Sequence, residues 1–221
     1  MIHDSVVIRG NVEIGERVTI EPYAIITGPC VIGDDSYIGA HAMIGGAPQH
    51  RGSYPSSTRD PMRMRGVEIG ADSCVREYAT IHHGVIKPTR IGDRVLIMSG
   101  THVAHDSTVG SGATIGSFSI FGGFTIIDHG VTFGQGVVTH PWTVIGEHAM
   151  VGLNSSVLKD VLPFQKVAGA PAKPIGMNRH KHPELPNDYE ASSLSVDVWD
   201  RWSDLLQIRM DDRAEWERVE A

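Results

Sequence analysis

The fold is decided by the stretch from Ile91 to Gly116, which reads IGDRVLIMSGTHVAHDSTVGSGATIG. Every sixth residue of this stretch is aliphatic, and the next residue is often glycine. A period of six matches neither the 3.6-residue turn of an amphipathic helix nor the alternation of a half-buried strand. Short strands joined by tight turns do match it, with one inward aliphatic residue per strand and small residues at the turns.

The same period runs through residues 2–44, 69–81 and 91–157, and Thr139 is its one polar member. Three such strands close a triangular coil of about 18 residues, and stacked coils lie roughly 4.8 Å apart. The chain has 25 glycines and only 6% aromatic residues, a balance that suits a repeat better than a layered core. The pattern therefore predicts an all-β protein, a parallel β-helix of about seven to eight coils.

The period is interrupted twice and then ends. Residues 46–66 and 82–90 leave it, and the first segment is rich in proline and arginine, so we expect loops ejected from the coil. We expect the β-helix to occupy residues 1–177. The tail, residues 178–221, is predicted to be a linker and one amphipathic helix whose tryptophans pack on the prism or on a neighbouring subunit, with a break near Asp211.

Composition excludes several classes of protein. The 221 residues include 26 acidic and 19 basic ones, and a net charge of −7 argues against binding to nucleic acid or to an anionic membrane. No apolar run approaches the roughly 18 residues that a membrane span needs. The chain has only two cysteines, Cys30 and Cys74, so we expect no disulfide framework. This cysteine content favours a protein of the reducing cytoplasm.

The histidines offer chemistry. His105 lies two residues past the inward Val103, so the register places it outside the prism, with Gly123 one coil further on and His140 close to the same line two coils on. His102 closes the preceding turn. A neutral imidazole can take a proton from a hydroxyl or amine near pH 7.

Two neighbours of His105 fit that chemistry. The carboxylate of Asp106 can fix the imidazole tautomer if the turn brings it round, and the bare backbone N–H of Gly123 can serve as an oxyanion donor. On position alone, His105 is equally well a solvated surface residue. Zinc held by histidines is the competing chemistry.

Several motifs together carry a resemblance to a known family. They are VREYATIH at Val75–His82, THVAHDSTVG at Thr101–Gly110, GGAPQ at Gly45–Gln49, HAMVG at His148–Gly152 and G-x-N at Gly176–Asn178. They resemble the UDP-N-acetylglucosamine O-acyltransferases of lipid A synthesis, and the similarity covers residues 1–178. The resemblance implies a left-handed β-helix, a homotrimer, sites between neighbouring subunits and no cofactor besides a thioester co-substrate.

The resemblance also assigns roles residue by residue. It implies that His105 is the general base, that Gly123 supplies the oxyanion N–H, that His140 assists and that His102 lines the site. It places Gln49 and Asn178 on nucleotide-sugar contacts. Leu153 falls where the size of the residue limits the acyl chain, which predicts a short to medium chain.

The chain departs from the family at several positions. His50 replaces an acid after Gln49, and Phe124 replaces a histidine after the oxyanion glycine. The expected phosphate-binding arginines are Glu184 and Leu185 here, and Arg179 is a nearby substitute.

These departures leave the substrates open. The acceptor is a hydroxyl of UDP-N-acetylglucosamine or an amine of a nucleotide-linked amino sugar for surface polysaccharide. The GAPAKP stretch at Gly169–Pro174 resembles CoA-dependent hexapeptide transferases, so the donor is acyl-CoA or acyl-carrier protein. A zinc-dependent γ-type carbonic anhydrase and a non-catalytic scaffold are the alternatives of another class.

Overall fold

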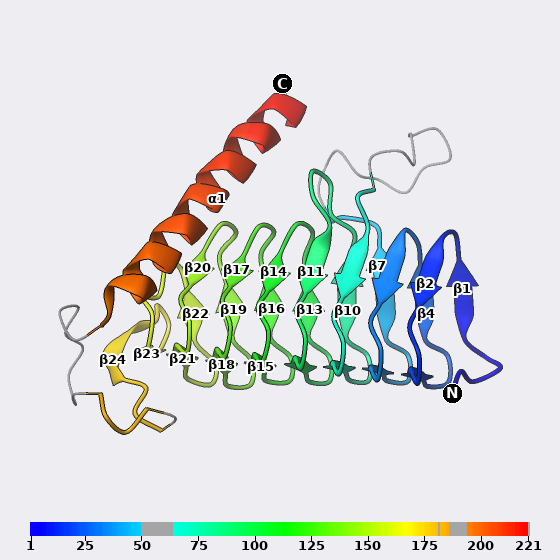
Figure 1. The fold of residues 1–221 in the computed structure, drawn as a ribbon, viewed down its shortest axis with the longest axis horizontal. Helices are drawn as coiled ribbons and strands as arrows, with labels where there is room; N and C mark the ends of the chain where they lie inside the picture. The colour runs from blue at the N-terminus through cyan, green and yellow to red at the C-terminus, as the bar shows by residue number, and fades with distance from the viewer. Residues whose placement is uncertain (50–63, 181, 186–193, 221) are drawn as a thin grey trace.

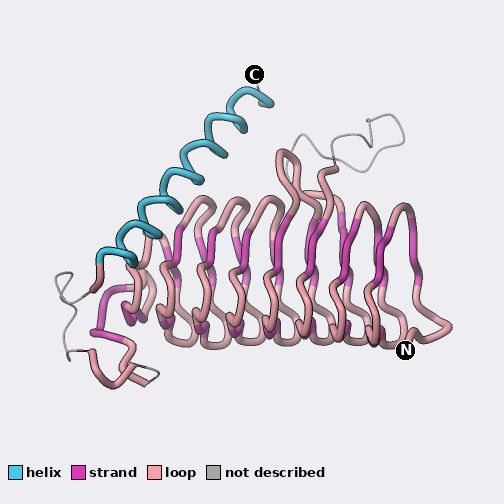
Figure 2. The backbone as a smooth tube through the Cα atoms, viewed as in Figure 1, coloured by secondary structure: helices cyan, strands magenta, loops and turns pink. Residues whose placement is uncertain are grey.

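A three-sided prism of short strands forms the body of the protein in this computed structural model (Figures 1 and 2). The structure describes residues 1–49, 64–180, 182–185 and 194–220. Successive coils stack with a register of one coil, so that Val103 pairs with Phe121 and Phe121 with Thr139. The predicted left-handed parallel β-helix is confirmed.

Each side of the prism is one sheet. Face 1 is an 8-stranded parallel sheet: β1 (Val7–Arg9), β4 (Ile25–Thr27), β7 (Met43–Gly46), β10 (Thr80–His82), β13 (His102–Val103), β16 (Ile120–Phe121), β19 (Val138–Thr139) and β22 (Ser156–Val157). Face 2 is a 7-stranded parallel sheet: β2 (Val12–Ile14), β5 (Cys30–Ile32), β8 (Val67–Ile69), β11 (Thr89–Ile91), β14 (Thr108–Val109), β17 (Ile126–Ile127) and β20 (Val144–Ile145).

Face 3 is a 9-stranded sheet: β3 (Thr19–Ile20), β6 (Tyr37–Ile38), β9 (Cys74–Val75), β12 (Leu96–Ile97), β15 (Thr114–Ile115), β18 (Thr132–Phe133), β21 (Met150–Val151), β23 (Gln165–Ala168) and β24 (Lys173–Met177). Its last strand, β24, runs antiparallel to β23 and so leaves the direction of the coil.

The inward residues of the repeat fill the axis of the prism. Ile26, Ile44 and Ile81 have no exposed surface, and burying an aliphatic side chain of this size contributes about 1.5–3 kcal/mol. Thr139, the polar member, is satisfied inside: its hydroxyl lies 3.0 Å from Thr125 Oγ1 and accepts from the Gly122 N–H at 3.3 Å. A buried hydroxyl with two partners does not carry the cost of an unpaired polar group.

The corner between face 1 and face 2 carries His105, Gly123 and Pro141 on successive coils, and we call it the His105 corner. The Phe124 N–H donates to the His105 carbonyl, which fixes this alignment. The next residue in each coil is left-handed, with φ of 59° at Asp106 and 61° at Phe124. The other corners use the same conformation, so it belongs to the coil geometry.

Both predicted loops leave the prism between faces 1 and 2. The first follows β7 and returns at β8, and its residues 50–63 lie outside the described residues. The second is shorter than the segment expected from the sequence, because His82 belongs to β10 and Thr89 begins β11.

A single continuous helix, α1 (Val196–Glu220), follows the prism. The break expected near Asp211 is wrong. The Asp211 carboxylate accepts from Gln207 Nε2 at 2.9 Å, one turn earlier, and Asp212 pairs with Lys87, so both acids are accommodated within the helix. No helix within the described ranges is long and apolar enough to cross a membrane.

Helix α1 runs obliquely back from the end of the prism that carries β23 and β24 (Figure 1). Trp202, which is 7% exposed, packs on Ile126 and Val144 of face 2. The partly buried residues that complete this cluster are Leu162, Trp199, Leu205 and Leu206. The helix therefore packs on β17 and β20 of face 2 of its own chain, and Trp199 and Trp202 contact the prism as predicted.

Candidate active site

His105 stands at the centre of the His105 corner, and its residue surface is only 9% exposed. Its Nδ1 lies 2.8 Å from Asp106 Oδ2. A carboxylate oxygen accepts, so Nδ1 carries the proton and Nε2 keeps its lone pair. The imidazole is thus held in the tautomer that a general base requires. The sequence predicted an outward residue, and the structure shows one that is outside the core yet mostly covered.

Asp106 is fully buried and is held by backbone donors of the second loop. Its carboxylate accepts from the N–H groups of Val85, Ile86 and Lys87 at 3.0, 2.8 and 3.0 Å. The left-handed φ of Asp106 turns its side chain toward His105, which a regular strand would not allow. The loop and the dyad therefore position each other.

Gly123 lies directly beneath the His105 ring. A Cβ built on Gly123 would stand 2.7 Å from His105 Cε1 and 2.8 Å from Nε2, far inside an ordinary contact. Only glycine allows this approach. The Gly123 N–H donates to no described residue. A backbone N–H without a protein acceptor is the kind of group that can stabilise an oxyanion.

Two more histidines adjoin the dyad: His102 precedes it in the same coil, and His82 lies on the neighbouring coil. The His82 and His102 rings meet edge to face with centroids 4.7 Å apart, and His102 Nδ1 lies 2.8 Å from Thr80 Oγ1. Burial lowers the pKa of His102 to about 4, with His82 and His105 adding to the effect, and burial also lowers the pKa of His82. Both rings are neutral near pH 7, so they oppose charge on His105 only weakly.

Three aromatic rings complete the surroundings of His105. Phe124 meets the His105 ring edge to face at 5.3 Å, and Trp142 stacks on Phe124 at 3.8 Å with an interplanar angle of 3°. Trp216 of α1 lies over the His105 ring at 5.6 Å and 22°. The histidine that the family carries at Phe124 is thus replaced by part of an aromatic wall.

The remaining predicted residues divide by location. His140 lies on the His105 corner, exposed, with Nδ1 2.9 Å from the Pro141 carbonyl. Gln49 is exposed near the base of the first loop, where His82 Nδ1 donates to Ala47 O at 2.6 Å. His50 lies outside the described residues.

Asn178, Arg179 and Leu153 lie at other corners. The Asn178 Nδ2 donates to the His148 carbonyl at 2.8 Å, at the corner between faces 2 and 3, and the side chain is buried. Arg179 follows it and donates to the Pro183 carbonyl at 3.0 Å. Leu153 is 69% exposed at the corner between faces 3 and 1. The register pairs His102 with Ile120, Val138 and then Ser156, so Leu153 borders the face of His102 without lying on its line.

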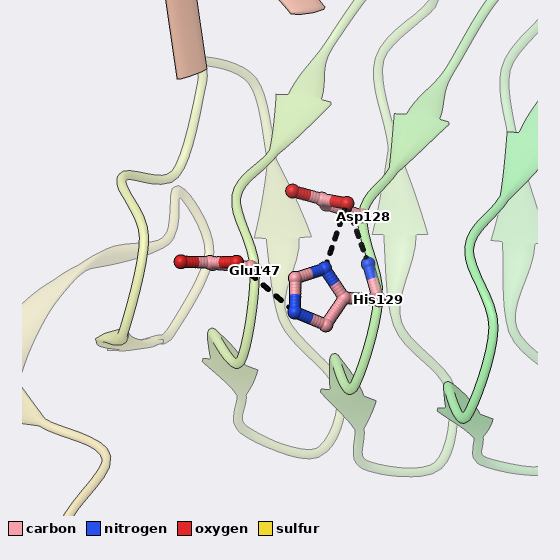
Figure 3. Close-up of side chains that lie close together, drawn as sticks. All are labelled: Asp128, His129 and Glu147. Atoms are coloured by element: carbon pink, nitrogen blue, oxygen red, sulfur yellow. Dashed lines mark hydrogen bonds and ion pairs between the residues drawn. The ribbon is translucent and has the colours of Figure 1, made fainter. Parts of the chain in front are cut away.

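One group of potential metal ligands occurs elsewhere in the described part of the chain: Asp128, His129 and Glu147 (Figure 3). His129 bridges the two acids, with Nδ1 3.1 Å from Asp128 and Nε2 3.0 Å from Glu147, and Arg201 of α1 reaches Glu147 at 3.4 Å. Burial raises the pKa of Glu147. Asp128, His129 and Glu147 are thus paired with one another and, through Arg201, with α1. The group does not include His82, His102 or His105.

Comparison with known proteins defines the class. The family model described as bacterial transferase hexapeptide (six repeats) matches residues 11–46 and 88–123, which include the His105–Asp106 dyad and Gly123. With the coil geometry above, these matches identify the hexapeptide repeat of bacterial transferases as the unit from which the prism is built.

Solved structures narrow the resemblance. The UDP-N-acetylglucosamine acyltransferase from Campylobacter jejuni is 27% identical, with a TM-score of 0.71 over 92% of this chain and 82% of that one. LpxA from Acinetobacter baumannii is 25% identical, with a TM-score of 0.70 over 88% of this chain and 78% of that one. The UDP-N-acetylglucosamine O-acyltransferase from Moraxella catarrhalis, at 24% identity and a TM-score of 0.70 over 96% and 93% of the two chains, shares the fold. The chain is similar to these enzymes in fold and along nearly its whole length.

Sequence reasoning missed two residues of this site. Trp216 lies 14 residues after Trp202, about four helical turns along, and the sequence alone gives it no role at the site. His82 lies in a motif that was recognised without giving it a role. The pairing of Thr80 with His102 brings it beside the site.

Proposed function

We propose that the chain transfers a short to medium acyl group from a thioester to a hydroxyl or amine of a nucleotide-linked sugar, with His105 as general base. His105 Nε2 takes the proton as the acceptor oxygen or nitrogen attacks the thioester carbonyl carbon. The Gly123 N–H donates to the oxyanion, the carbon–sulfur bond breaks, and the proton passes to the leaving thiolate. The products are an ester or amide and a free thiol, and no cofactor takes part.

The observation that carries this proposal is the contact between the base nitrogen and a bare backbone. Asp106 fixes the tautomer of His105. A Cβ at Gly123 would be 2.8 Å from Nε2, so the proposed base and the proposed oxyanion donor lie within a few ångströms of each other. This is the arrangement that acyl transfer needs, because the proton leaves the nucleophile where negative charge develops on the adjacent oxygen.

The acceptor class rests on likeness to enzymes named for UDP-N-acetylglucosamine. His102, His140, Gln49 and His50 are the residues we assign to its surroundings on this chain. Between the two acceptor chemistries, the altered first loop at His50, the short tail and Leu153 favour an amine of a nucleotide-linked amino sugar over a hydroxyl. The product decides: hydroxylamine cleaves an ester and leaves an amide intact.

The site is completed by a second copy in a homotrimer. A rigid prism cannot bring the His105 corner together with Asn178, Arg179 and Leu153, which lie at its other two corners. Helix α1 packs on β17 and β20 of face 2, whereas face 1 presents the exposed apolar residues Ile120 and Val138, an arrangement typical of a subunit interface. Sedimentation analysis of the intact chain tests this, and a monomer contradicts it.

The activity is tested by thiol release from acetyl-, butyryl- and decanoyl-CoA and from the matching carrier-protein thioesters. Each donor is run against UDP- and dTDP-linked sugars and amino sugars. We expect the active pair to lose about 10²–10⁴-fold of its turnover in His105→Ala, the usual contribution of a general base. Wild-type turnover in His105→Ala would show that His105 is not the general base. If no donor and acceptor pair gives turnover with the wild-type protein, the proposed acyl transfer is wrong.

A further inference from the structure

Trp216 of α1 packs on one face of the His105 ring. Asp106 holds Nδ1, Phe124 meets the edge of the ring and Gly123 lies beneath it. Trp216 lies over the ring at 5.6 Å and 22°, and it meets Phe124 at 5.1 Å and 68°. The Trp216 ring therefore packs against both the base and the aromatic wall beside it.

Side chains of α1 hold this part of the helix in place. Arg209 pairs with Asp160 at 2.6 Å and points Nη1 at the Trp142 carbonyl. Asp212 pairs with Lys87 of the second loop, in a contact where both side chains are 16% exposed. Arg209, Asp212 and Trp216 follow one another at spacings of three and four residues, so they share one face of the helix. The position of Trp216 is thus fixed from both sides of the His105 corner.

We propose that Trp216 is a positioning residue that acts through His105: it holds the imidazole against Gly123 and keeps water from it, so that the C-terminal helix completes the active site. This inference rests on the proposed function. The base needs a fixed place, because a displacement of about 1 Å in a reacting group costs about 10²-fold in rate. It also needs a dry one, because water that reaches the base can attack the thioester carbonyl in place of the sugar.

The consequence is a change in reaction partition. With Trp216 removed, water reaches the space above the ring, and its attack releases the acyl group as a carboxylic acid with the same free thiol. We expect Trp216→Ala to lower the kcat for transfer by about 10- to 100-fold with KM for the sugar changed by less than about threefold. We also expect the fraction of thiol release that yields free acid to rise several-fold. A helix with only a structural role would lower both reactions together.

The test compares Trp216→Ala and Trp216→Phe with Met210→Ala, an exposed position on the same helix. Besides turnover and partition, it measures how fast diethyl pyrocarbonate modifies His105, read on the His105 peptide by mass spectrometry. We expect faster modification by about 10-fold or more in Trp216→Ala, near wild-type values in Trp216→Phe, and no change in Met210→Ala.

The modification readout does not depend on substrate. If His105 is modified at the wild-type rate in Trp216→Ala while the variant keeps its helical circular dichroism, Trp216 does not cover the base and the inference is wrong. If Trp216→Ala loses its helical signal, Trp216→Phe becomes the deciding variant. Faster modification of His105 together with lost transfer in Trp216→Phe would contradict the inference that an aromatic ring at this position covers the base. Normal turnover in His105→Ala instead contradicts the proposed function and leaves the modification result standing.

Discussion

Gly123→Ala is the sharpest perturbation of the site, because it adds one methyl group where His105, the proposed base, contacts the backbone of Gly123, the proposed oxyanion donor. The new Cβ would stand 2.7 Å from His105 Cε1 and 2.8 Å from Nε2, and an ordinary contact begins at 3.4 Å. The ring therefore has to retreat by about 0.7 Å. Trp216 lies over it and Asp106 holds Nδ1 at 2.8 Å, so the retreat breaks or bends that bond.

The expected cost is about 10²-fold in kcat, or about 2.7 kcal/mol of transition-state stabilisation. The Gly123 N–H remains, so the loss measures the position of His105 rather than the oxyanion donor. The KM for the sugar should stay within about threefold. Single-turnover acyl transfer with the active donor and acceptor pair is the assay.

A matched control is available in the same repeat. An alanine at Gly112 meets no atom within 4 Å, and its φ of 71° costs only the strain of a left-handed residue, about 1–2 kcal/mol. We expect Gly112→Ala to lower the free energy of unfolding slightly and to leave turnover unchanged. If Gly123→Ala keeps transfer within threefold of the wild type, the close contact at Nε2 has no bearing on catalysis and the reasoning is refuted.

Three further predictions concern stability and specificity. Burial lowers the pKa of His83 from 6.5 to about 4. Between these values the unfolded chain binds a proton that the folded chain does not, so the free energy of unfolding falls by up to about 3 kcal/mol as the pH drops from 6.5 to 4. His83→Gln should flatten this slope in urea unfolding, and an unchanged slope argues against it. Leu153→Ala should shift the donor preference to longer chains by about 0.8 kcal/mol per methylene accommodated; an identical donor profile excludes Leu153 as the limit. Asp212→Asn should lower the free energy of unfolding by about 1–3 kcal/mol because Lys87 loses a charged partner, and the same denaturation midpoint as wild type would contradict this.

The repeat made most of the fold predictable. Each aliphatic sixth residue marks an inward position, and Thr139, the exception in the pattern, is buried with a hydroxyl partner. The coil length of 18 residues also predicts that His105 and Gly123 align on successive coils, because they lie 18 residues apart. This worked because every coil contacts only its neighbours, so that position along the sequence fixes position in space.

Two features of the site could not be predicted from the six-residue repeat. The bond between His105 and Asp106 depends on a left-handed residue, and alternation along a strand predicts opposite directions for adjacent side chains. The place of Trp216 depends on how α1 docks on face 2, through Trp202 and the pair of Arg209 with Asp160. Docking of a helix on a smooth prism is a tertiary choice, and no period in the sequence encodes it.

The second loop links these features into one unit. Its backbone N–H groups at Val85, Ile86 and Lys87 hold the Asp106 carboxylate, and the side chain of Lys87 pairs with Asp212 of α1. A carboxylate held by three backbone donors and an imidazole has little freedom to turn, so it transmits the position of the loop to His105. The same six-residue loop therefore sets the base on one side and anchors the helix that covers it on the other. A hexapeptide prism supplies only rows of short strands, and in this chain the departures from the repeat build the surroundings of His105.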